Sequence, residues 1–178
     1  MPSNRFNSTD SVGCLKTIDE QHSKVHDGLS FTGNHYEKLA GAGSAVTILI
    51  TAPATGAHYH FIAEIDVDGP GLLTLSRAPN ATATNGTVLT ALNDNENSSN
   101  TNTLVHVANG TYTSSGTIMR SFVIGGSSGV GAQGAIIGGG KDGRFEIEFG
   151  LGSVHLIRWV ADLASCRTAI RTHFYRES

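Results

Sequence analysis

Two histidines and a glutamate within one short segment are the residues of this chain best suited to bind a metal ion. They are His58, His60 and Glu64, in the sequence GAHYHFIAEIDVDGPG of residues 56–71. In a β-strand, side chains two or four residues apart lie on the same face, so all three would project together. A divalent ion needs such a convergence of three or four ligands. The segment therefore raises the hypothesis of a metal-dependent enzyme.

The same segment resembles the first half of the metal-binding motif of cupin barrels, G-x5-H-x-H-x3-4-E-x6-G. The two histidines, the glutamate and Gly71 match its spacing, but Ala52 stands where the leading glycine belongs. The second half of the cupin motif reads Pro-x-Gly-x-x-His-x-x-x-Asn, and GLGSVHLIRW (150–159) supplies only the glycine and the histidine of it. A cupin metal also lies inside the barrel, so its ligands must share the buried face of their strand.

The alternation along residues 58–67 predicts which way these side chains face. One face is apolar, and it carries Tyr59, Phe61, Ala63, Ile65 and Val67. The other face is mostly polar and holds both histidines and the glutamate, which is typical of a half-buried antiparallel strand. We therefore expect His58, His60 and Glu64 to face solvent or a neighbouring subunit. We expect no catalytic residue, metal or cofactor, and a cupin-like enzyme using these three residues stays as an alternative.

The other motifs that carry chemistry are missing from the sequence. No G-x-S-x-G nucleophile elbow occurs. GGGKDG (138–143) departs from a phosphate-binding loop, because Ala135 and Asp142 stand where a glycine and a Ser or Thr are required. The sequence therefore predicts a protein that is not an enzyme.

The composition favours an all-β domain with long loops. Charged residues make up only 15% of the chain, and 22 of its 178 residues are glycine. The formal net charge is −3, which gives no electrostatic reason to bind nucleic acid. We see no signal peptide and no apolar run of membrane-spanning length. We expect a protein made in a cytoplasm, with neither nucleic acid nor membrane as partner.

The chain divides into a polar arm and a β-domain. Residues 1–27 contain only isolated apolar residues and support at most one short helical turn, so we expect a mostly irregular N-terminal arm. Residues 28–178 carry many short apolar or alternating runs separated by turn residues, which predicts a single jelly-roll-like β-sandwich. The predicted strands span residues 45–51, 58–67, 72–77, 87–92, 103–113, 116–124, 143–150, 153–163 and 167–175.

Turn and low-complexity segments connect these strands. DGPG (68–71) is typical of a turn, so the strands on either side of it are predicted to pair as a hairpin. The loop at 93–103, NDNENSSNTNT, is either solvated or ordered by Asn and Thr side chains that bond local backbone. The glycine-rich loop at 125–143 is either a flexible excursion or a place of close backbone approach at an interface.

The order of several segments resembles the head decoration (cement) proteins of tailed bacteriophages, a family of the jelly-roll type. The resemblance spans about residues 22–178, and Glu96 stands where the family usually has an arginine. The matching segments are KVHDGLSF (24–31), ILITAPATGAHYHFIAEIDVDGPGLLTL (48–75), LNDNENSSNTNT (92–103), IGGG (137–140) and the closing HFYRE (173–177).

The resemblance implies a structural virion protein that is made in the host cytoplasm. It would bind the outer surface of an assembled capsid as a homotrimer and cement the shell by bridging capsid subunits. Its partners would be the major capsid protein and other copies of itself. The arm would lie along the capsid or a neighbouring subunit, and the candidate contact residues there are Arg5, Phe6, Leu15, Ile18 and His22.

Two further sets of residues are candidates for binding. The last predicted strand carries Arg171, His173 and Tyr175, and arginine and aromatic residues are enriched in protein interfaces.

A carbohydrate-binding jelly roll of a phage fibre is the remaining alternative function, since the same fold serves lectins. Trp159 and Tyr112 would be its sugar-stacking residues.

Overall fold

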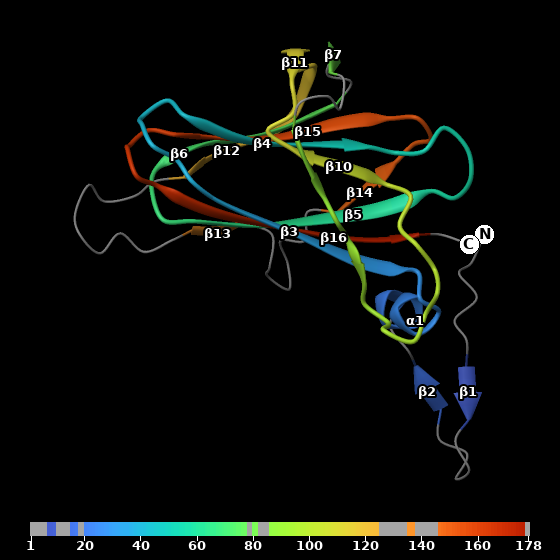
Figure 1. The fold of residues 1–178 in the computed structure, drawn as a ribbon. Helices are drawn as coiled ribbons and strands as arrows, with labels where there is room; N and C mark the ends of the chain where they lie inside the picture. Colours follow the sequence, from blue (N-terminus) through green and yellow to red (C-terminus); the bar gives the residue numbers. More distant parts are fainter. Residues whose placement is uncertain are drawn as a thin grey trace.

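Two antiparallel β-sheets packed face to face form the body of the molecule (Figure 1). The structure is a computed structural model, and it describes residues 7–9, 15–17, 20–77, 80–81, 86–124, 135–137 and 146–176. Within these residues nearly all regular structure is strand, with a single helix, α1 (Glu20–His26). That helix is too short to cross a membrane, and the described part of the chain contains no other candidate span.

One sheet, which we call the β15 sheet, has six strands. In spatial order they are β12 (Thr117–Ile124), β6 (Gly71–Arg77), β15 (Val154–Ala161), β4 (Ala45–Thr51), β10 (Val105–Ala108) and β8 (Thr87–Leu89).

The other sheet, which we call the β16 sheet, runs in the order β13 (Ala135–Ile137), β5 (Tyr59–Val67), β16 (Arg167–Arg176), β3 (Ser30–Lys38) and β9 (Leu92–Asn93). Strand β14 (Glu146–Phe149) also pairs with β5 and completes this sheet. Two small two-stranded sheets join β1 (Asn7–Thr9) with β2 (Leu15–Thr17) and β7 (Asn80–Ala81) with β11 (Tyr112–Ser114).

The path of the chain through these sheets is that of a jelly roll. Eight strands follow this path: the chain changes sheet at each step from β3 through β4 and β5 to β6, returns to the same sheet at β12 after the short strands β7 to β11, and then alternates again through β14, β15 and β16. The last two strands insert between strands formed earlier, β15 between β4 and β6 and β16 between β3 and β5. Four strands of each sheet are thus connected in the order that defines the jelly-roll architecture. The sequence-based prediction of the fold is confirmed.

One predicted pairing is wrong. Strands β5 and β6 do not form a hairpin, because β5 lies in the β16 sheet and β6 in the β15 sheet. The DGPG turn at residues 68–71 therefore carries the chain across the sandwich. The two strands face each other through the core, where Phe61 and Ile65 of β5 and Leu73 and Leu75 of β6 belong to one buried cluster.

The apolar faces of the two sheets make up this core. The largest fully buried side chains are aromatic, and each contributes about 1.5–3 kcal/mol through burial. They come from both sheets and are Trp159, Tyr59, Phe31, Phe61, Phe149 and Phe174. Phe31 and Phe174 stack with ring centres 5.5 Å apart, which fixes the register of β3 against β16.

The N-terminal segment contains more regular structure than the sequence predicted. Helix α1 precedes β3, and the short pair β1–β2 lies beyond the helix, clear of both large sheets (Figure 1). A two-stranded sheet of this size is at best marginally stable alone in water. The segment is thus an arm that leaves the jelly roll at α1.

Candidate functional site

Two of the proposed metal ligands, His60 and Glu64, lie on the outer face of β5, as the alternation predicts, and His58 directly precedes the strand. The apolar residues of this strand are buried in the core, whereas His60 and Glu64 are partly exposed. His58 Nδ1 lies 3.2 Å from Glu148 Oε1, and Glu64 Oε2 accepts a 2.7 Å hydrogen bond from Arg171 Nη1. The imidazole of His60 stacks on the ring of Tyr175, 4.8 Å between centres.

This arrangement does not bring the three side chains to one point. At a rise of about 3.3 Å per residue, His60 and Glu64 are separated by roughly 13 Å along the strand. Glu64 pairs with Arg171 and His60 stacks on Tyr175, so each of these two side chains is engaged by a different residue of β16. In the described ranges of the chain, no group of three or more His, Cys, Asp or Glu side chains is placed to hold a metal.

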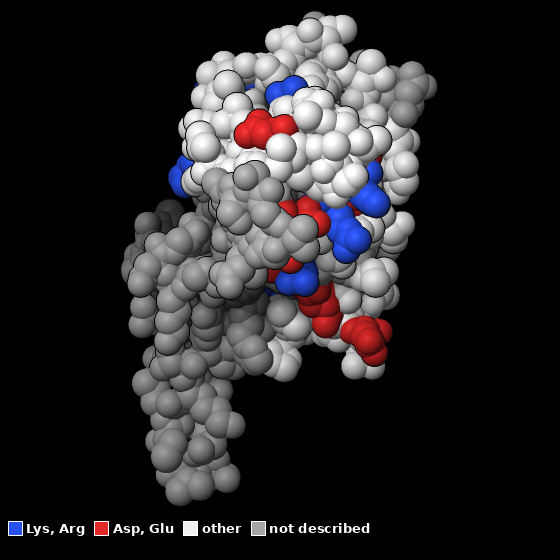
Figure 2. All heavy atoms as spheres, turned by 90° about the vertical axis from the view of Figure 1, so that its left-hand side faces the viewer, with Lys and Arg blue, Asp and Glu red and all other residues white. Residues whose placement is uncertain are grey.

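Acidic and basic side chains on this side of the molecule lie in pairs. Besides the Arg171–Glu64 pair, Arg167 Nε lies 3.9 Å from Asp68 Oδ2. Figure 2 shows such neighbouring charges in the middle of the view, with a mostly uncharged surface above them. The outer face of the β16 sheet is therefore polar, and Arg171 and Arg167 each lie beside a carboxylate of the same chain.

The predicted interface residues lie on the outer face of the last strand, β16, and contact their own chain. Arg171 pairs with Glu64, and His173 Nδ1 lies 3.5 Å from Asp94 Oδ2. Tyr175 is only 7% exposed. Of the three, Arg171 is the one whose side chain is mostly exposed, at 61%.

The predicted arm contacts fall largely outside the described residues. Arg5, Phe6 and Ile18 lie outside the described ranges. Leu15 is the first residue of β2 and His22 is in α1, and the description of both covers the backbone only.

The sugar-stacking prediction fails for Trp159. This side chain is fully buried in the core between the sheets, so it cannot contact a carbohydrate at the surface. Tyr112 is half buried and packs on a small apolar cluster made by Leu49, Val107 and Leu156 of the β15 sheet. Trp159 and Tyr112 therefore do not form a surface on which a sugar ring could stack.

The most elaborate polar structure is the junction between the arm and the jelly roll, where helix α1 ends. Gly28 has a φ of 67°, its N–H donates to the Val25 carbonyl (3.0 Å), and the Leu29 N–H donates to the Lys24 carbonyl (2.8 Å). This is a Schellman motif, which favours glycine because only glycine adopts positive φ without a steric penalty. The helix thus stops at a fixed position, directly before β3.

The Asn-rich segment caps the carbonyl groups at this helix end. The side-chain amides of Asn95, Asn100 and Asn93 donate to the carbonyls of three consecutive residues, 26, 27 and 28, at 3.0, 3.3 and 2.9 Å. The last carbonyls of a helix have no partner within the helix, so such caps satisfy groups that otherwise need water. A Cβ on Gly28 would lie 2.0 Å from Ser98 Oγ, which shows how closely the segment is packed against the chain reversal.

The same segment is ordered by its own side chains. The Oδ1 atoms of Asn93, Asn95 and Asn102 accept hydrogen bonds from backbone N–H groups two residues ahead, at 2.8–3.0 Å. Ser98 Oγ accepts from the N–H of Asn100 in the same way. These local turns are the reason that Asn and Ser dominate here. Of the two interpretations of this loop, the one with Asn side chains bonding local backbone is confirmed.

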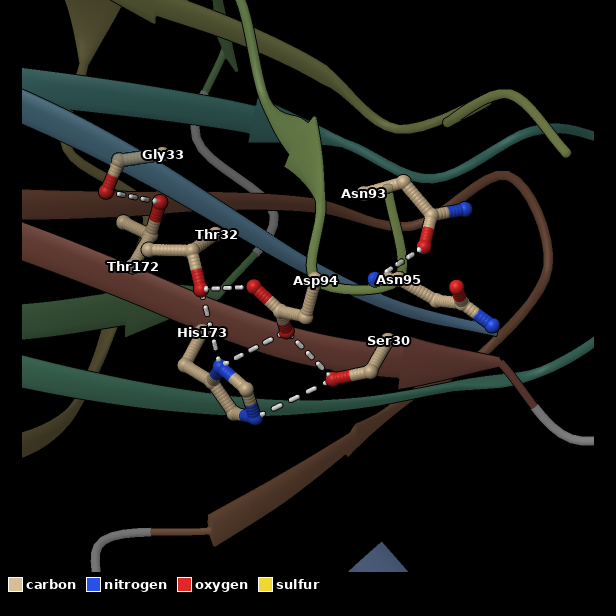
Figure 3. Close-up of polar contacts among 8 residues, drawn as sticks. All are labelled: Ser30, Thr32, Gly33, Asn93, Asp94, Asn95, Thr172 and His173. Carbon is tan, nitrogen blue, oxygen red and sulfur yellow. Dashed lines mark hydrogen bonds and ion pairs between the residues drawn. The ribbon is translucent and has the colours of Figure 1, made fainter. Parts of the chain in front are cut away.

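Asp94 fastens the beginning of this segment to the β16 sheet (Figure 3). Its carboxylate accepts hydrogen bonds from Ser30 Oγ (2.6 Å) and Thr32 Oγ1 (2.7 Å), both on β3. On β16, His173 Nδ1 lies 3.1 Å from Thr32 Oγ1 and Nε2 lies 3.4 Å from Ser30 Oγ. The four side chains form a closed polar cluster that links the loop to two central strands.

This cluster contains the residue types of a hydrolase triad but not its geometry. In a triad the imidazole stands between the hydroxyl and the carboxylate and takes the hydroxyl proton. Here the single proton of each hydroxyl is donated directly to Asp94, so neither Ser30 nor Thr32 is activated by His173. The cluster therefore acts as a structural clamp. The sequence analysis missed it, although an aspartate within an Asn-rich tract was a visible signal.

Comparisons of the chain with protein-family models, with curated proteins and with solved structures found no match.

Proposed function

We propose that this chain is a structural virion protein that binds the outside of an assembled phage capsid as a homotrimer and cements the shell by bridging capsid subunits. It would be made in the host cytoplasm, act without catalysis or cofactor, and have the major capsid protein as its partner. The proposal starts from the segment order that resembles capsid decoration proteins.

One structural observation supports it most directly. The Asn-rich segment, one of the segments that carry the resemblance, holds the base of the arm through Asn93, Asn95 and Asn100. A sequence feature shared with a family of shell-binding proteins thus has a mechanical role at the point where an arm leaves a rigid body. A rigid β-sandwich with an arm of fixed origin suits a protein that must reach across a lattice.

The physical basis of cementing is mass action. A protein that binds the assembled lattice and not the free subunits shifts the equilibrium toward the intact shell. Three linked copies add avidity, because one bound subunit raises the effective concentration of the other two at their sites. The β1–β2 pair lies clear of both large sheets, where a capsid surface could contact it.

Co-sedimentation with assembled shells tests the proposal. We expect the full chain to sediment with shells of its phage and to stay in the supernatant with unassembled capsid subunits. Shells carrying it should break at a higher temperature than bare shells. Equal binding to free subunits, or no binding to shells, would contradict the function.

A deletion of residues 1–19 tests the role of the arm. This variant keeps α1 and its Asn caps, so the jelly roll should fold as in the full chain. We expect its occupancy on shells to fall at least tenfold at a fixed protein concentration. Unchanged occupancy would remove the arm from the mechanism while leaving shell binding itself in place.

A further inference from the structure

The two large sheets carry different charges. The six strands of the β15 sheet contain three arginines, Arg77, Arg120 and Arg158, and no aspartate or glutamate. The strands of the β16 sheet contain both signs in nearly equal number. Its acidic residues are Glu37, Glu64, Asp66, Glu146 and Glu148, and its basic residues are Lys38, Arg167, Arg171 and Arg176. Among the described strands, those of the β15 sheet are thus the positively charged ones.

Arg158 is the arginine in the middle of this sheet. Its strand, β15, lies between β4 and β6, and Arg158 is opposite Thr47 on one side and Thr74 on the other. Its neighbours in sequence, Ile157 and Trp159, are buried in the core. Because successive side chains of a strand point to opposite faces, Arg158 points to the outer face, where it is partly buried.

The guanidinium group of Arg158 has no partner among the described residues. No ion pair or hydrogen bond joins it to another side chain, and its Nε is buried without an acceptor. Nη1 and Nη2 are not buried in this way, so they are the atoms that a ligand can reach. On the opposite sheet, by contrast, Arg171 donates to Glu64 and Arg167 lies beside Asp68. A cation that is partly removed from water without an anion is unfavourable, so this position favours an incoming anion.

The surface around Arg158 is mostly uncharged. Two residues further along β15, Val160 lies opposite Leu72, which is 39% exposed, and two residues back, Leu156 belongs to a small apolar cluster. The upper part of Figure 2, on the side of the β15 sheet, is accordingly mostly uncharged. The acidic residue closest in sequence, Asp162, lies beyond the end of β15 and forms no ion pair with Arg158 within the described ranges.

A carboxylate on a protein is the anion that fits this position best. A guanidinium group binds a carboxylate or a phosphate through two parallel hydrogen bonds. The apolar side chains beside Arg158 favour an anion that is itself flanked by apolar groups, as an Asp or Glu side chain of a protein surface is, and a free phosphate is not. An arginine surrounded by apolar contacts is also typical of the residues that contribute most to protein–protein affinity.

This surface is separate from the arm. Helix α1 contacts β3 and β16 and lies on the side of the β16 sheet in Figure 1. The outer face of the β15 sheet is on the other side of the sandwich. A partner bound there would leave the base of the arm accessible.

We propose that the outer face of the β15 sheet, centred on Arg158, binds an aspartate or glutamate side chain of a protein partner. Nη1 and Nη2 of Arg158 donate to the two carboxylate oxygens, and Leu72 and Val160 pack against apolar groups next to that carboxylate. The inference goes beyond the proposed function, because it requires neither a capsid nor a trimer.

Peptide binding measured by nuclear magnetic resonance on the full chain tests this surface. The probe is the capped peptide acetyl-Leu-Glu-Leu-amide, and its counterpart with Gln in place of Glu is the matched control. The Nε–H signal of Arg158, identified by its absence in Arg158→Gln, and the backbone amide signals of Leu72 and Val160 report binding. Inorganic phosphate and sodium chloride at equal ionic strength are the further controls.

We expect the Glu peptide to shift these signals, with an affinity that falls as salt is added. The Gln peptide and the Arg158→Gln variant should each bind about tenfold more weakly, because a hydrogen bond to a charged group is lost. Arg167→Gln is the protein control, since Arg167 is 62% exposed on the opposite sheet and already lies beside Asp68. It should bind the Glu peptide as the wild type does.

The melting temperature separates a binding role from a structural one. Since no described group accepts from Arg158 Nε, Arg158→Gln should melt at the wild-type temperature or above it. A variant that melts well below the wild type or fails to fold would show that Arg158 is structural and would refute the proposal. Equal binding of the two peptides, no binding of either, or a larger response to phosphate than to the Glu peptide would refute it as well.

Discussion

The imidazole of His106 packs edge-on against the ring of Phe174, with 4.9 Å between the ring centres and 78° between the planes. His106 is fully buried, and neither ring nitrogen has a hydrogen-bond partner within the described residues. Burial disfavours the charged form and lowers the pKa of His106 to about 4. The imidazole of His106, on β10, is therefore uncharged at neutral pH and packs like an apolar side chain. Its protonation in acid favours unfolding.

We predict that the free energy of unfolding falls as the pH is lowered from 6.5 toward 4. In this range the unfolded chain takes up a proton on His106 that the folded chain does not bind, so acid favours unfolding. The difference between 6.5 and about 4 corresponds to about 3 kcal/mol, lost in full near pH 4. Urea unfolding of the wild type and His106→Leu at a series of pH values measures the effect.

For His106→Leu, the free energy of unfolding should depend less steeply on pH than for the wild type. The difference in slope should be about 1.4 kcal/mol per pH unit between pH 6.5 and 4. The slope for the variant should not reach zero, because burial and the positive charge of Arg77 also lower the pKa of His155 to about 4. Identical slopes for the wild type and the variant would show that His106 is not the titrating group.

Gly28→Ala should lower the free energy of unfolding by more than the same substitution at Gly43, another glycine with positive φ. Gly28 has a φ of 67°, and an added Cβ would also collide with Ser98. Gly43 is the matched control, since its φ is 78° and an added Cβ there meets nothing within 4 Å. Gly43→Ala should therefore cost only the backbone term of about 1–2 kcal/mol. Denaturant midpoints of the two variants would be compared, and equal losses would refute close packing at Gly28.

Asn95→Ala should loosen the base of the arm. It removes the amide that caps the His26 carbonyl and the oxygen that accepts from the Asn97 N–H. A net contribution of about 1 kcal/mol for such a hydrogen bond corresponds to roughly fivefold faster exchange of the α1 amides with deuterium. Asn97→Ala is the control, because the structure gives the Asn97 side chain no hydrogen bond within the described residues. Equal exchange in both variants would exclude a capping role for Asn95.

Metal analysis tests whether the outer face of β5 binds a metal ion. After exposure to excess zinc and removal of unbound metal, we expect less than one bound equivalent, because Glu64 pairs with Arg171 and His60 stacks on Tyr175. His60→Ala should give the same result as the wild type. One tightly bound equivalent that is lost in His60→Ala would revive the enzyme hypothesis.

Strands made of a continuous run of apolar residues could be predicted from the sequence. Residues 45–51 were predicted as a strand and form β4, because a run of β-branched and apolar residues suits a central strand. Strand β3 was not recognised, since SFTGNHYEK mixes polar residues into both faces. Its outward hydroxyls, Ser30 and Thr32, bind Asp94, so their role in the clamp obscured the alternation.

Pairing between strands was harder to predict than the strands themselves. A turn such as DGPG specifies a reversal of the chain but not whether the next strand joins the same sheet or the facing one. The inward residues of β5 and β6 are apolar in either case, so their pattern fits both arrangements. The clamp was hidden for a related reason, because Ser30 and His173 are 143 residues apart in sequence and only the fold brings them together.

The position of β16 has a consequence for how the chain folds as it is synthesised. This strand lies between β3 and β5 and pairs with both, so until it is made nothing links the two earlier strands within their sheet. While the ribosome is still adding the residues that follow β5, the β16 sheet remains incomplete and its strands have unpaired edges. Folding that depends on such distant pairings is slow and exposes strand edges to other nascent chains. A ribosome that stalls before Arg167 would therefore release a chain that lacks the centre of a sheet, and we expect quality-control proteases to remove it.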